Sequence, residues 1–508
     1  MFQPHSVHPA ASFEVSWPRR PGERRARRAS LLPAAAALMF MAGCASLPPA
    51  SHSPAATDSI ADRWHAPLPP GGQWEDLRRW WSTFDDPTLL SLIDAAQTVS
   101  PTIAQAGAAI ADARAQWVAH GAALQPSLDV NARSGRGRVD LDDPTGTVSS
   151  IGLMASWELD LFGGNRAGQR GAQARLTASR ANWHAARVAV AAEVAMSYSR
   201  LRACEALLLQ VQQDEQSRAQ TSRLTALAAD AGLESRVTAD LASASAAQGT
   251  TVRIQQQARC DLWIKALVAL SARDERDLRR AFVERTALLP GPAAIQIAAV
   301  PAQVLVQRPD IQAAEQEVVA ASAGVAQADA QRLPRVSLTG SIGIQQLGMG
   351  GVRTDGRVWQ IGPVAVTMPL FDGGRGRANA EAARVRHQAA TTIYAGTLRE
   401  AIQEVEGALV ELQSATERRA AAQAAADGFS RSFLALQSRY QAGMASLLEL
   451  EDARRSKVSA QRDLIGTDEQ QVLAWITLYR ALGGGWDADA MQRISAVSRA
   501  SQQIKPVE

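Results

Sequence analysis

The sequence predicts a mainly α-helical, internally duplicated chain that combines long helical hairpins with four short β-strands. Three observations lead to this fold class. Landmark residues recur in one order at a spacing of roughly 208 residues, which indicates a tandem duplication rather than an array of many repeats. Very long, polar, alanine-rich stretches follow a glycine-rich turn in each half. Between the helical stretches, apolar and polar residues alternate with the period of a strand.

The landmarks of the duplication match in order along most of the chain. Each pair joins a residue of the first copy to its counterpart in the second: Pro101 and Pro309, Pro126 and Pro334, Leu161-Phe162 and Leu370-Phe371, Gly232 and Gly443. A nearly constant offset over so many positions makes chance an improbable explanation. Most of the 508-residue chain therefore consists of two copies of one plan.

The N-terminal region has the layout of an export signal. Six arginines between Arg19 and Arg28 precede a short apolar run that begins at Leu31. A bilayer-spanning helix needs about 20 apolar residues, and this run is shorter. It ends at Met41-Ala42-Gly43-Cys44, which resembles a bacterial lipoprotein box and so implies cleavage before Cys44 and acylation of the Cys44 thiol. The alternative is a chance cysteine behind a plain signal peptide.

The charge of the chain argues against an electrostatic nucleic-acid binder. Its formal net charge is +3, but residues 1–43 supply six arginines and only two acids. The remaining chain is close to neutral, and a nucleic-acid partner is therefore not expected.

In each copy, the first elements are a helix and two strands. Residues 102–123 and 311–332 predict helices that stop before a proline. Alternating patterns then predict strands, and these lie near residues 127–133, 150–161, 335–344 and 358–370. The fourth pattern is less regular because it contains Pro363. Four strands cannot close a membrane barrel, since the smallest have about eight. Several chains must then pool their strands, either eight from a dimer or twelve from a homotrimer.

A long helical hairpin completes each copy. The first is expected from about Ala167 to Asp230, with a break at Gly232 and a return to about Arg280. The second is expected from about Ala378 to Tyr440, with a break at Gly443 and a return to about Leu482. A helix of about 60 residues would be on the order of 90 Å long. Small and apolar residues with coiled-coil spacing form a seam in the first hairpin: Val190, Val194, Ser197, Leu201, Cys204, Leu208 and Val211.

Two cysteines lie at equal distances from the expected end of the first hairpin. Cys204 and Cys260 are each 28 residues from Gly232, so antiparallel arms place them at the same height. An exported chain folds in an oxidising compartment. We therefore expect a disulfide between Cys204 and Cys260, and the alternative is a pair of buried free thiols.

Several motifs resemble the TolC-like outer-membrane efflux proteins, and with the lipoprotein box they resemble the lipoprotein branch that serves RND-type pumps. The motifs are Trp80-Trp81-Ser82-Thr83-Phe84-Asp85-Asp86-Pro87, Arg308-Pro309-Asp310-Ile311, Pro369-Leu370-Phe371-Asp372-Gly373-Gly374-Arg375, Tyr440-Gln441-Ala442-Gly443 and Leu482-Gly483-Gly484-Gly485-Trp486. The resemblance covers residues from about 74 to 486. It implies a homotrimer with a twelve-stranded outer-membrane barrel and a periplasmic helical tunnel. It also implies docking on a periplasmic adaptor (membrane fusion) protein and an inner-membrane RND-type transporter.

The resemblance assigns a function and a domain plan. The expected function is a passive, lipid-anchored exit duct for drugs or other small molecules in the bacterial outer membrane, with no cofactor and no catalysis. The expected domains are a signal peptide (1–43), a linker anchored in outer-membrane lipid (44–73), two efflux repeats (74–300 and 301–486) and a tail (487–508). Two alternatives stay open, namely an outlet for metal ions or secreted polypeptides, and a non-conducting periplasmic coiled-coil scaffold.

The resemblance also points to a gate at the end of the second hairpin. By position, Leu448 and Asp452 are the expected constriction pair, and four-residue spacing places them on one helical face. Three copies would form an apolar ring beside an acidic ring, and an acidic ring can favour cations. Arg439 is a candidate for a salt-bridge network, while Gln441 stands where the family often has a basic residue. The alternative for Asp452 is an ordinary surface acid.

The sequence offers no catalytic or metal-binding motif. The Gly-Gly turns lack the Lys-Ser/Thr ending of a phosphate-binding loop. The seven histidines have no paired ligand spacing, and no nucleophile has a recognisable context.

Overall fold

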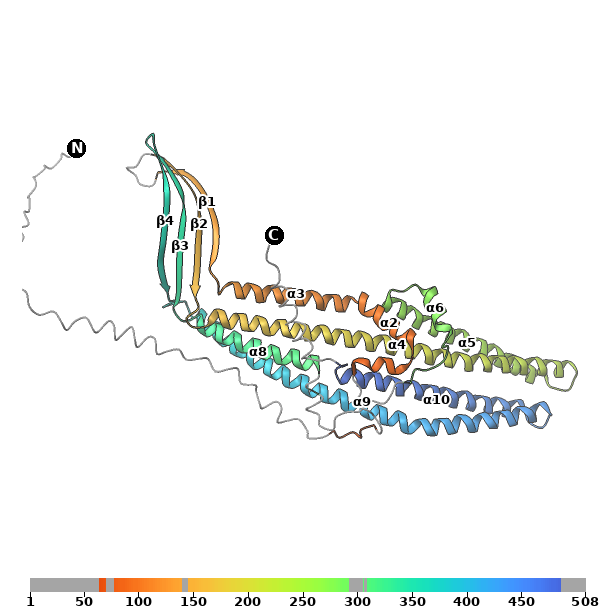
Figure 1. Ribbon diagram of the computed structural model, residues 1–508. Coiled ribbons are helices and arrows are strands. Elements are labelled where there is room, and N and C mark those ends of the chain that lie inside the picture. Colours follow the sequence, from red (N-terminus) through yellow and green to blue (C-terminus); the bar gives the residue numbers. More distant parts are fainter. Residues whose placement is uncertain (1–63, 70–76, 139–144, 292–304, 306–307, 486–508) are drawn as a thin grey trace, which may run out of the picture. The chain divides into compact units, whose positions relative to one another are not determined.

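The computed structural model describes residues 64–69, 77–138, 145–291, 305 and 308–485, all within the unit His52–Glu508. Two copies of one plan follow each other along the chain (Figure 1), as the sequence predicts. The first has α3 (Pro101–Ala122), β1 (Ser127–Gly137), β2 (Gly146–Leu159), α4 (Gly164–Asp230) and α5 (Arg236–Ser271). The second has α8 (Pro309–Ala330), β3 (Arg335–Met349), β4 (Val352–Thr367), α9 (Arg375–Gln441) and α10 (Leu447–Ala481). The predicted signal peptide, the lipidation site Cys44 and the tail from residue 487 lie outside the described residues.

The four strands form one antiparallel sheet in the order β1-β2-β3-β4. The register aligns apolar residues across the sheet, as in the row Val130, Leu153, Ile342 and Trp359. The fourth strand starts at Val352, earlier than predicted. Its first residues are mostly polar and show no alternating pattern, but they pair with β3. A register shift opposite Leu338 and Gly340 interrupts the alternation near Pro363.

An aspartate holds each joint between a strand and a long helix. The Asp160 carboxylate accepts hydrogen bonds from the backbone N–H groups of Asn165 (3.1 Å) and Arg166 (2.9 Å). The Asp372 carboxylate accepts from the N–H groups of Gly374 (2.9 Å) and Gly376 (2.7 Å), and these bonds lower its pKa below the ordinary value. These aspartates satisfy N–H groups that have no partner inside the helix.

Each hairpin reverses at a glycine with left-handed backbone. Gly232 has φ of +75° and Gly443 has φ of +72°, a region that favours glycine. In each turn a backbone N–H closes back onto the finished helix, from Leu233 to Ala228 O and from Met444 to Arg439 O, both at 2.8 Å. A serine, Ser235 or Ser446, then caps the returning helix.

The return arm of the first hairpin is shorter than predicted. We expected helix to about Arg280, but α5 ends at Ser271, where Ala272 adopts a φ of +52°. The side chain of Asp274 then accepts bonds from the N–H groups of Arg276 and Asp277 and starts a separate helix, α6 (Glu275–Val283). Because α6 starts with its own cap, a helical pattern through this region does not imply one continuous helix.

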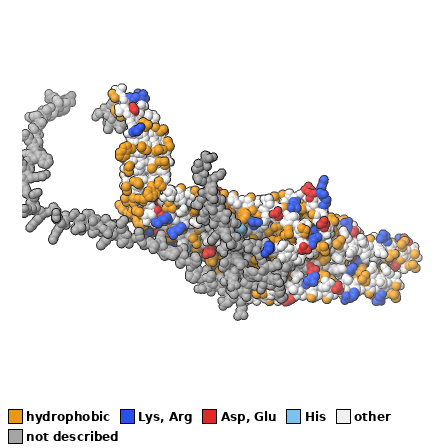
Figure 2. Space-filling view, viewed as in Figure 1, with side chains coloured by type: hydrophobic (Ala, Val, Ile, Leu, Met, Phe, Trp, Pro, Cys, Tyr) orange, Lys and Arg blue, Asp and Glu red, His pale blue; other side chains and the backbone are white. Residues whose placement is uncertain are grey.

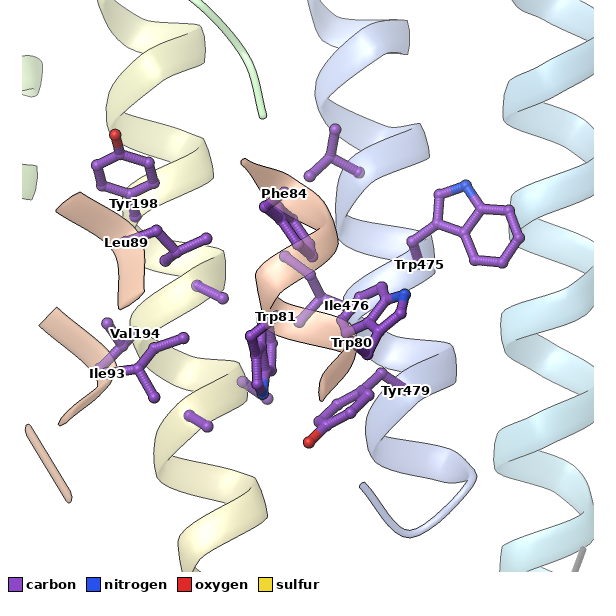
Figure 3. Close-up of a cluster of buried hydrophobic side chains, with 14 of the residues drawn as sticks. Trp80, Trp81, Phe84, Leu89, Ile93, Val194, Tyr198, Trp475, Ile476 and Tyr479 are labelled. Atoms are coloured by element: carbon purple, nitrogen blue, oxygen red, sulfur yellow. The ribbon is translucent and has the colours of Figure 1, made fainter. Parts of the chain in front are cut away.

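The core of the helical part joins the beginning of the described chain to the end of the second hairpin. The helix η2 (Leu77–Phe84) places the Trp80 ring in a stack on Tyr479 of α10, with ring centroids 4.7 Å apart and an interplanar angle of 14°. Figure 3 shows Trp81 and Phe84 in the same cluster. The helix α2 (Pro87–Val99) adds Leu89, which is fully buried.

The predicted seam of the first hairpin belongs to this core. Val194 and Leu201 are fully buried in α4 and lie in the same hydrophobic cluster as the aromatic residues. Tyr198, one turn from each, donates its hydroxyl to the Asp86 carboxylate at 2.7 Å. The seam thus packs against more than its own hairpin. In the described part of the chain, no helix has the length and apolar character needed to cross a membrane.

Candidate gate at the hairpin ends

The two residues of the expected constriction lie together on the exposed side of α10. The Leu448 side chain is 62% exposed, and the Asp452 carboxylate is paired with Arg455 one turn further along the helix. Leu447 and Leu450 are buried on the opposite side. The helix therefore presents an apolar and an acidic residue, one turn apart, away from the core of its own chain.

Arg439 is involved in the turn rather than in an ion pair with the other hairpin. Its guanidinium donates to the carbonyl of Met444 at 3.2 Å, so it ties the last turn of α9 to the loop that precedes α10. Nearby, Glu449 forms a reciprocal cap with Ser446, and the backbone N–H of Ser446 holds the pKa of this carboxyl below its usual value. The charge of Arg439 contributes to the same lowering.

One hydrogen bond joins the two hairpins directly beside this turn. The hydroxyl of Tyr440 lies 2.8 Å from Oγ1 of Thr225, which is 1% exposed in α4. The Thr225 hydroxyl donates to the carbonyl of Thr221 at 2.9 Å, so Tyr440 is the donor of the shared bond. The sequence gives no signal for Thr225, because its partner is 215 residues away and a threonine in a helix is unremarkable.

A buried charge cluster extends this connection along α10. Arg454 is 1% exposed, and its guanidinium donates to the hydroxyls of Ser217 and Thr221, both at 3.1 Å, and approaches Asp214 at 3.6 Å. It also pairs with Glu451. Burial lowers the pKa of Arg454, and the two acids oppose that effect. Sequence reasoning missed this cluster because a charged helical residue is usually solvated.

Arg218 connects the cluster to the third helix. It pairs with Asp214 at 2.7 Å and with Glu451 at 3.3 Å, and it donates to the Ser245 hydroxyl at 2.7 Å. Since these residues come from α4, α10 and α5, the cluster fixes the return arm of the second hairpin against both arms of the first.

The two cysteines meet further from the hairpin end. Cys204 of α4 and Cys260 of α5 are joined as a disulfide, with Cα atoms 5.5 Å apart. Both are buried, and the Gln256 side chain donates to the carbonyl of Cys204 at 3.1 Å. The structure thus brings together Cys204 with Cys260, and Leu448 with Asp452. It leaves Arg439 at the turn, and among the described residues no bond joins Arg439 to Leu448 or Asp452.

A duplicated chain with two long hairpins, a four-stranded sheet and hairpin ends of this kind defines the class of outer-membrane efflux channels. The chain matches the model of the family "Outer membrane efflux protein" over residues 92–272 and 300–484, and it belongs to that family. It is an outer-membrane channel component of tripartite efflux systems, and its long helices form a periplasmic tunnel.

Individual relatives cover nearly the whole chain. Outer membrane protein OprJ of Pseudomonas aeruginosa is 32% identical over 461 residues, which are 88% of this chain and 94% of OprJ. The solvent efflux pump outer membrane protein SrpC of Pseudomonas putida is 29% identical over 472 residues, which are 89% of this chain and 97% of SrpC. The structure of the open state of the Neisseria gonorrhoeae MtrE outer membrane channel superimposes with a TM-score of 0.74 at 26% identity, covering 84% of this chain and 96% of MtrE.

Proposed function

We propose that the chain forms a homotrimeric, passive exit duct for drugs or other small molecules. An inner-membrane RND-type transporter delivers these molecules through a periplasmic adaptor protein, and the duct itself performs no catalysis. The observation that carries the proposal is the two-sided sheet. One face has rows of apolar side chains, while the other carries polar residues such as Asp129, Asn131 and Gln360. An apolar outside and a polar lumen are what a water-filled barrel in lipid requires.

The open edges of the sheet support a barrel that is built from the strands of several chains. Within the described residues, β1 pairs only with β2 and β4 pairs only with β3, so both outer strands keep a free edge. Unpaired backbone groups are costly in lipid, and closure between neighbouring chains removes them. Three chains supply twelve strands, within the size range of membrane barrels.

The anchor and the gate complete the proposal. Acylation at Cys44, motivated by the sequence Met41-Ala42-Gly43-Cys44, would add a lipid anchor in the outer membrane. At the other end, three copies of Leu448 and Asp452 would form an apolar and an acidic ring around the exit path. Arg439 would keep the turn that carries them in place. The small-molecule cargo is supported by the similarity to SrpC, whose name refers to solvent efflux.

Single-channel conductance of the purified full-length oligomer in a planar bilayer tests this function. We expect a small, cation-favouring conductance that increases and loses part of its cation preference in Asp452→Ala. Asp463→Ala, which removes another exposed acid of α10, is the matched control and should leave the conductance unchanged. A larger conductance in both variants would place the gate elsewhere, and a folded oligomer without any conductance would refute the channel.

A further inference from the structure

The apolar face of the sheet ends in a group of arginines. On this face, the row of Val130, Leu153, Ile342 and Trp359 is followed by a row in which Arg357 aligns with Ala132, Ile151 and Ile344. Two rows further, Arg136 of β1 and Arg353 of β4 align through Thr147 and Gly348. Arg136, Arg353 and Arg357, which we term the arginine collar, therefore lie on the apolar face at the sheet end remote from the helices.

Side-chain contacts support this placement. Ser134 and Ser149, in the row between Arg357 and Arg136, bond to each other at 2.9 Å, and Arg353 donates to Gln346 of the same face at 2.9 Å. All three collar arginines are exposed. Figure 2 shows hydrophobic side chains along the sheet and Lys or Arg side chains at its remote end.

The collar carries a net positive charge within the described residues. Asp355 lies between Arg353 and Arg357 on the same face, but no ion pair joins it to either arginine there. Three guanidinium groups and one carboxylate leave a net positive charge. The sequence also places Asp140, Asp142 and Asp143 in the loop between β1 and β2, outside the described residues, so the inference rests on the strand arginines alone.

The position of the collar matches the edge of a bilayer. From Val366 to Arg357, the apolar part of β4 is roughly 30 Å long at about 3.3 Å per residue, or about 23 Å high at a tilt of about 40°. Membrane barrels have an apolar band about 25 Å tall. Arg357 and Arg353 therefore reach the headgroup level on the lipid side, and because the helices are periplasmic, this level belongs to the outer leaflet.

We propose that the arginine collar binds the phosphate groups of the phosphorylated glycolipid in the outer leaflet. Guanidinium groups are suited to this ligand because they hold phosphate oxygens through two parallel hydrogen bonds. The apolar rows beside them contact the acyl chains of the same lipid. One lipid molecule therefore contacts both the arginine collar and the apolar rows, which adjoin each other on the same face of the sheet.

Binding of fluorescent diphosphoryl lipid A to the full-length oligomer in detergent tests this inference, with dephosphorylated lipid A as the comparison probe. We expect binding that weakens with salt, prefers the phosphorylated lipid, and drops tenfold or more in the triple variant Arg136→Gln/Arg353→Gln/Arg357→Gln. Arg133→Gln is the matched control, since Arg133 lies on the polar face of the same strand, and it should bind as the wild type does.

Single variants and conductance measurements distinguish a loss of lipid binding from misfolding and from a loss of channel function. If the triple variant fails to assemble, the single variants Arg353→Gln and Arg357→Gln should each weaken binding about threefold, in proportion to the charge removed. Equal binding of both lipids, equal binding of phosphatidylglycerol, or an equal loss in Arg133→Gln would overturn the assignment. Conductance should be unchanged in the triple variant, so a failure here leaves the proposed channel standing.

Discussion

The hydroxyl of Tyr440 donates a hydrogen bond to Oγ1 of Thr225 and so links the end of the second hairpin to the first. The two residues belong to different copies of the duplication. Any separation of α9 from α4 at this end must break their bond, because neither side chain can span a wider gap.

Removal of this bond should make the channel easier to open. Tyr440→Phe deletes the donor and keeps the ring, and we expect a higher single-channel conductance or a longer open time. Thr225→Val deletes the acceptor and should have the same effect, with no further increase in the double variant. Additive effects would show that the two hydroxyls act through other partners.

The buried Arg454 should be important for stability. Arg454→Met removes a fully buried guanidinium that pairs with Asp214 and Glu451 and leaves Arg218 as their remaining partner. Loss of one member of a buried ion pair typically costs about 3–5 kcal/mol, and Arg218 should hold the loss near the lower end. We expect a clearly lower midpoint of thermal unfolding by circular dichroism. Arg455→Met, which removes an exposed pair with Asp452, should change the stability by no more than about 0.5 kcal/mol. A similar loss of stability in the Arg454 and Arg455 variants would contradict the proposed importance of burial.

The disulfide between Cys204 and Cys260 closes a sequence separation of 56 residues. Loss of chain entropy in the unfolded state on closing a loop of this size stabilises the fold by about 4 kcal/mol. Cys204→Ala/Cys260→Ala should therefore unfold at a lower temperature than the unreduced wild type.

Alkylation followed by mass spectrometry checks the same bond. With Cys44 acylated, unreduced protein should take up no alkyl group, and reduced, unfolded protein should take up two. Detection of two free thiols before reduction would show that Cys204 and Cys260 are not bonded.

A partly buried histidine in α4 should make stability depend on pH. Burial lowers the pKa of His184 to about 4, and the charge of Arg187 adds to this effect. Between about pH 6.5 and pH 4 the unfolded chain binds the proton more readily, so stability should fall as the pH decreases through this range. Thermal unfolding at pH 7 and pH 4.5 should show a smaller loss for His184→Gln than for the wild type or for His387→Gln.

Local sequence patterns were sufficient to predict most elements of the fold. Period-two alternation located the strands, and the breaks at Gly232 and Gly443 located the hairpin ends, because both signals depend on nearby residues. The prediction was wrong for the region after Ser271, where the cap at Asp274 starts a new helix. It also missed the start of β4, whose polar residues pair with β3 without an apolar pattern.

The candidate site was less predictable because its contacts join distant parts of the chain. Leu448 and Asp452 could be placed on one face from their spacing alone, and their role as a gate stays a prediction. Thr225, Ser217 and Arg454 could not be identified, since a hydroxyl or a charge in a long polar helix has no pattern of its own. Their importance follows only from the contacts that α9 and α10 make with α4.

The aspartates at the two strand–helix joints show how the copies have diverged. Phe162 and Phe371 correspond at an offset of 209, whereas Asp160 and Asp372 correspond at 212, so the acid lies before the Leu-Phe pair in one copy and after it in the other. Both carboxylates nevertheless hold the first N–H groups of a long helix. Both copies thus need an acceptor for these N–H groups at the joint. In each copy an aspartate supplies it, but from a different position in the sequence.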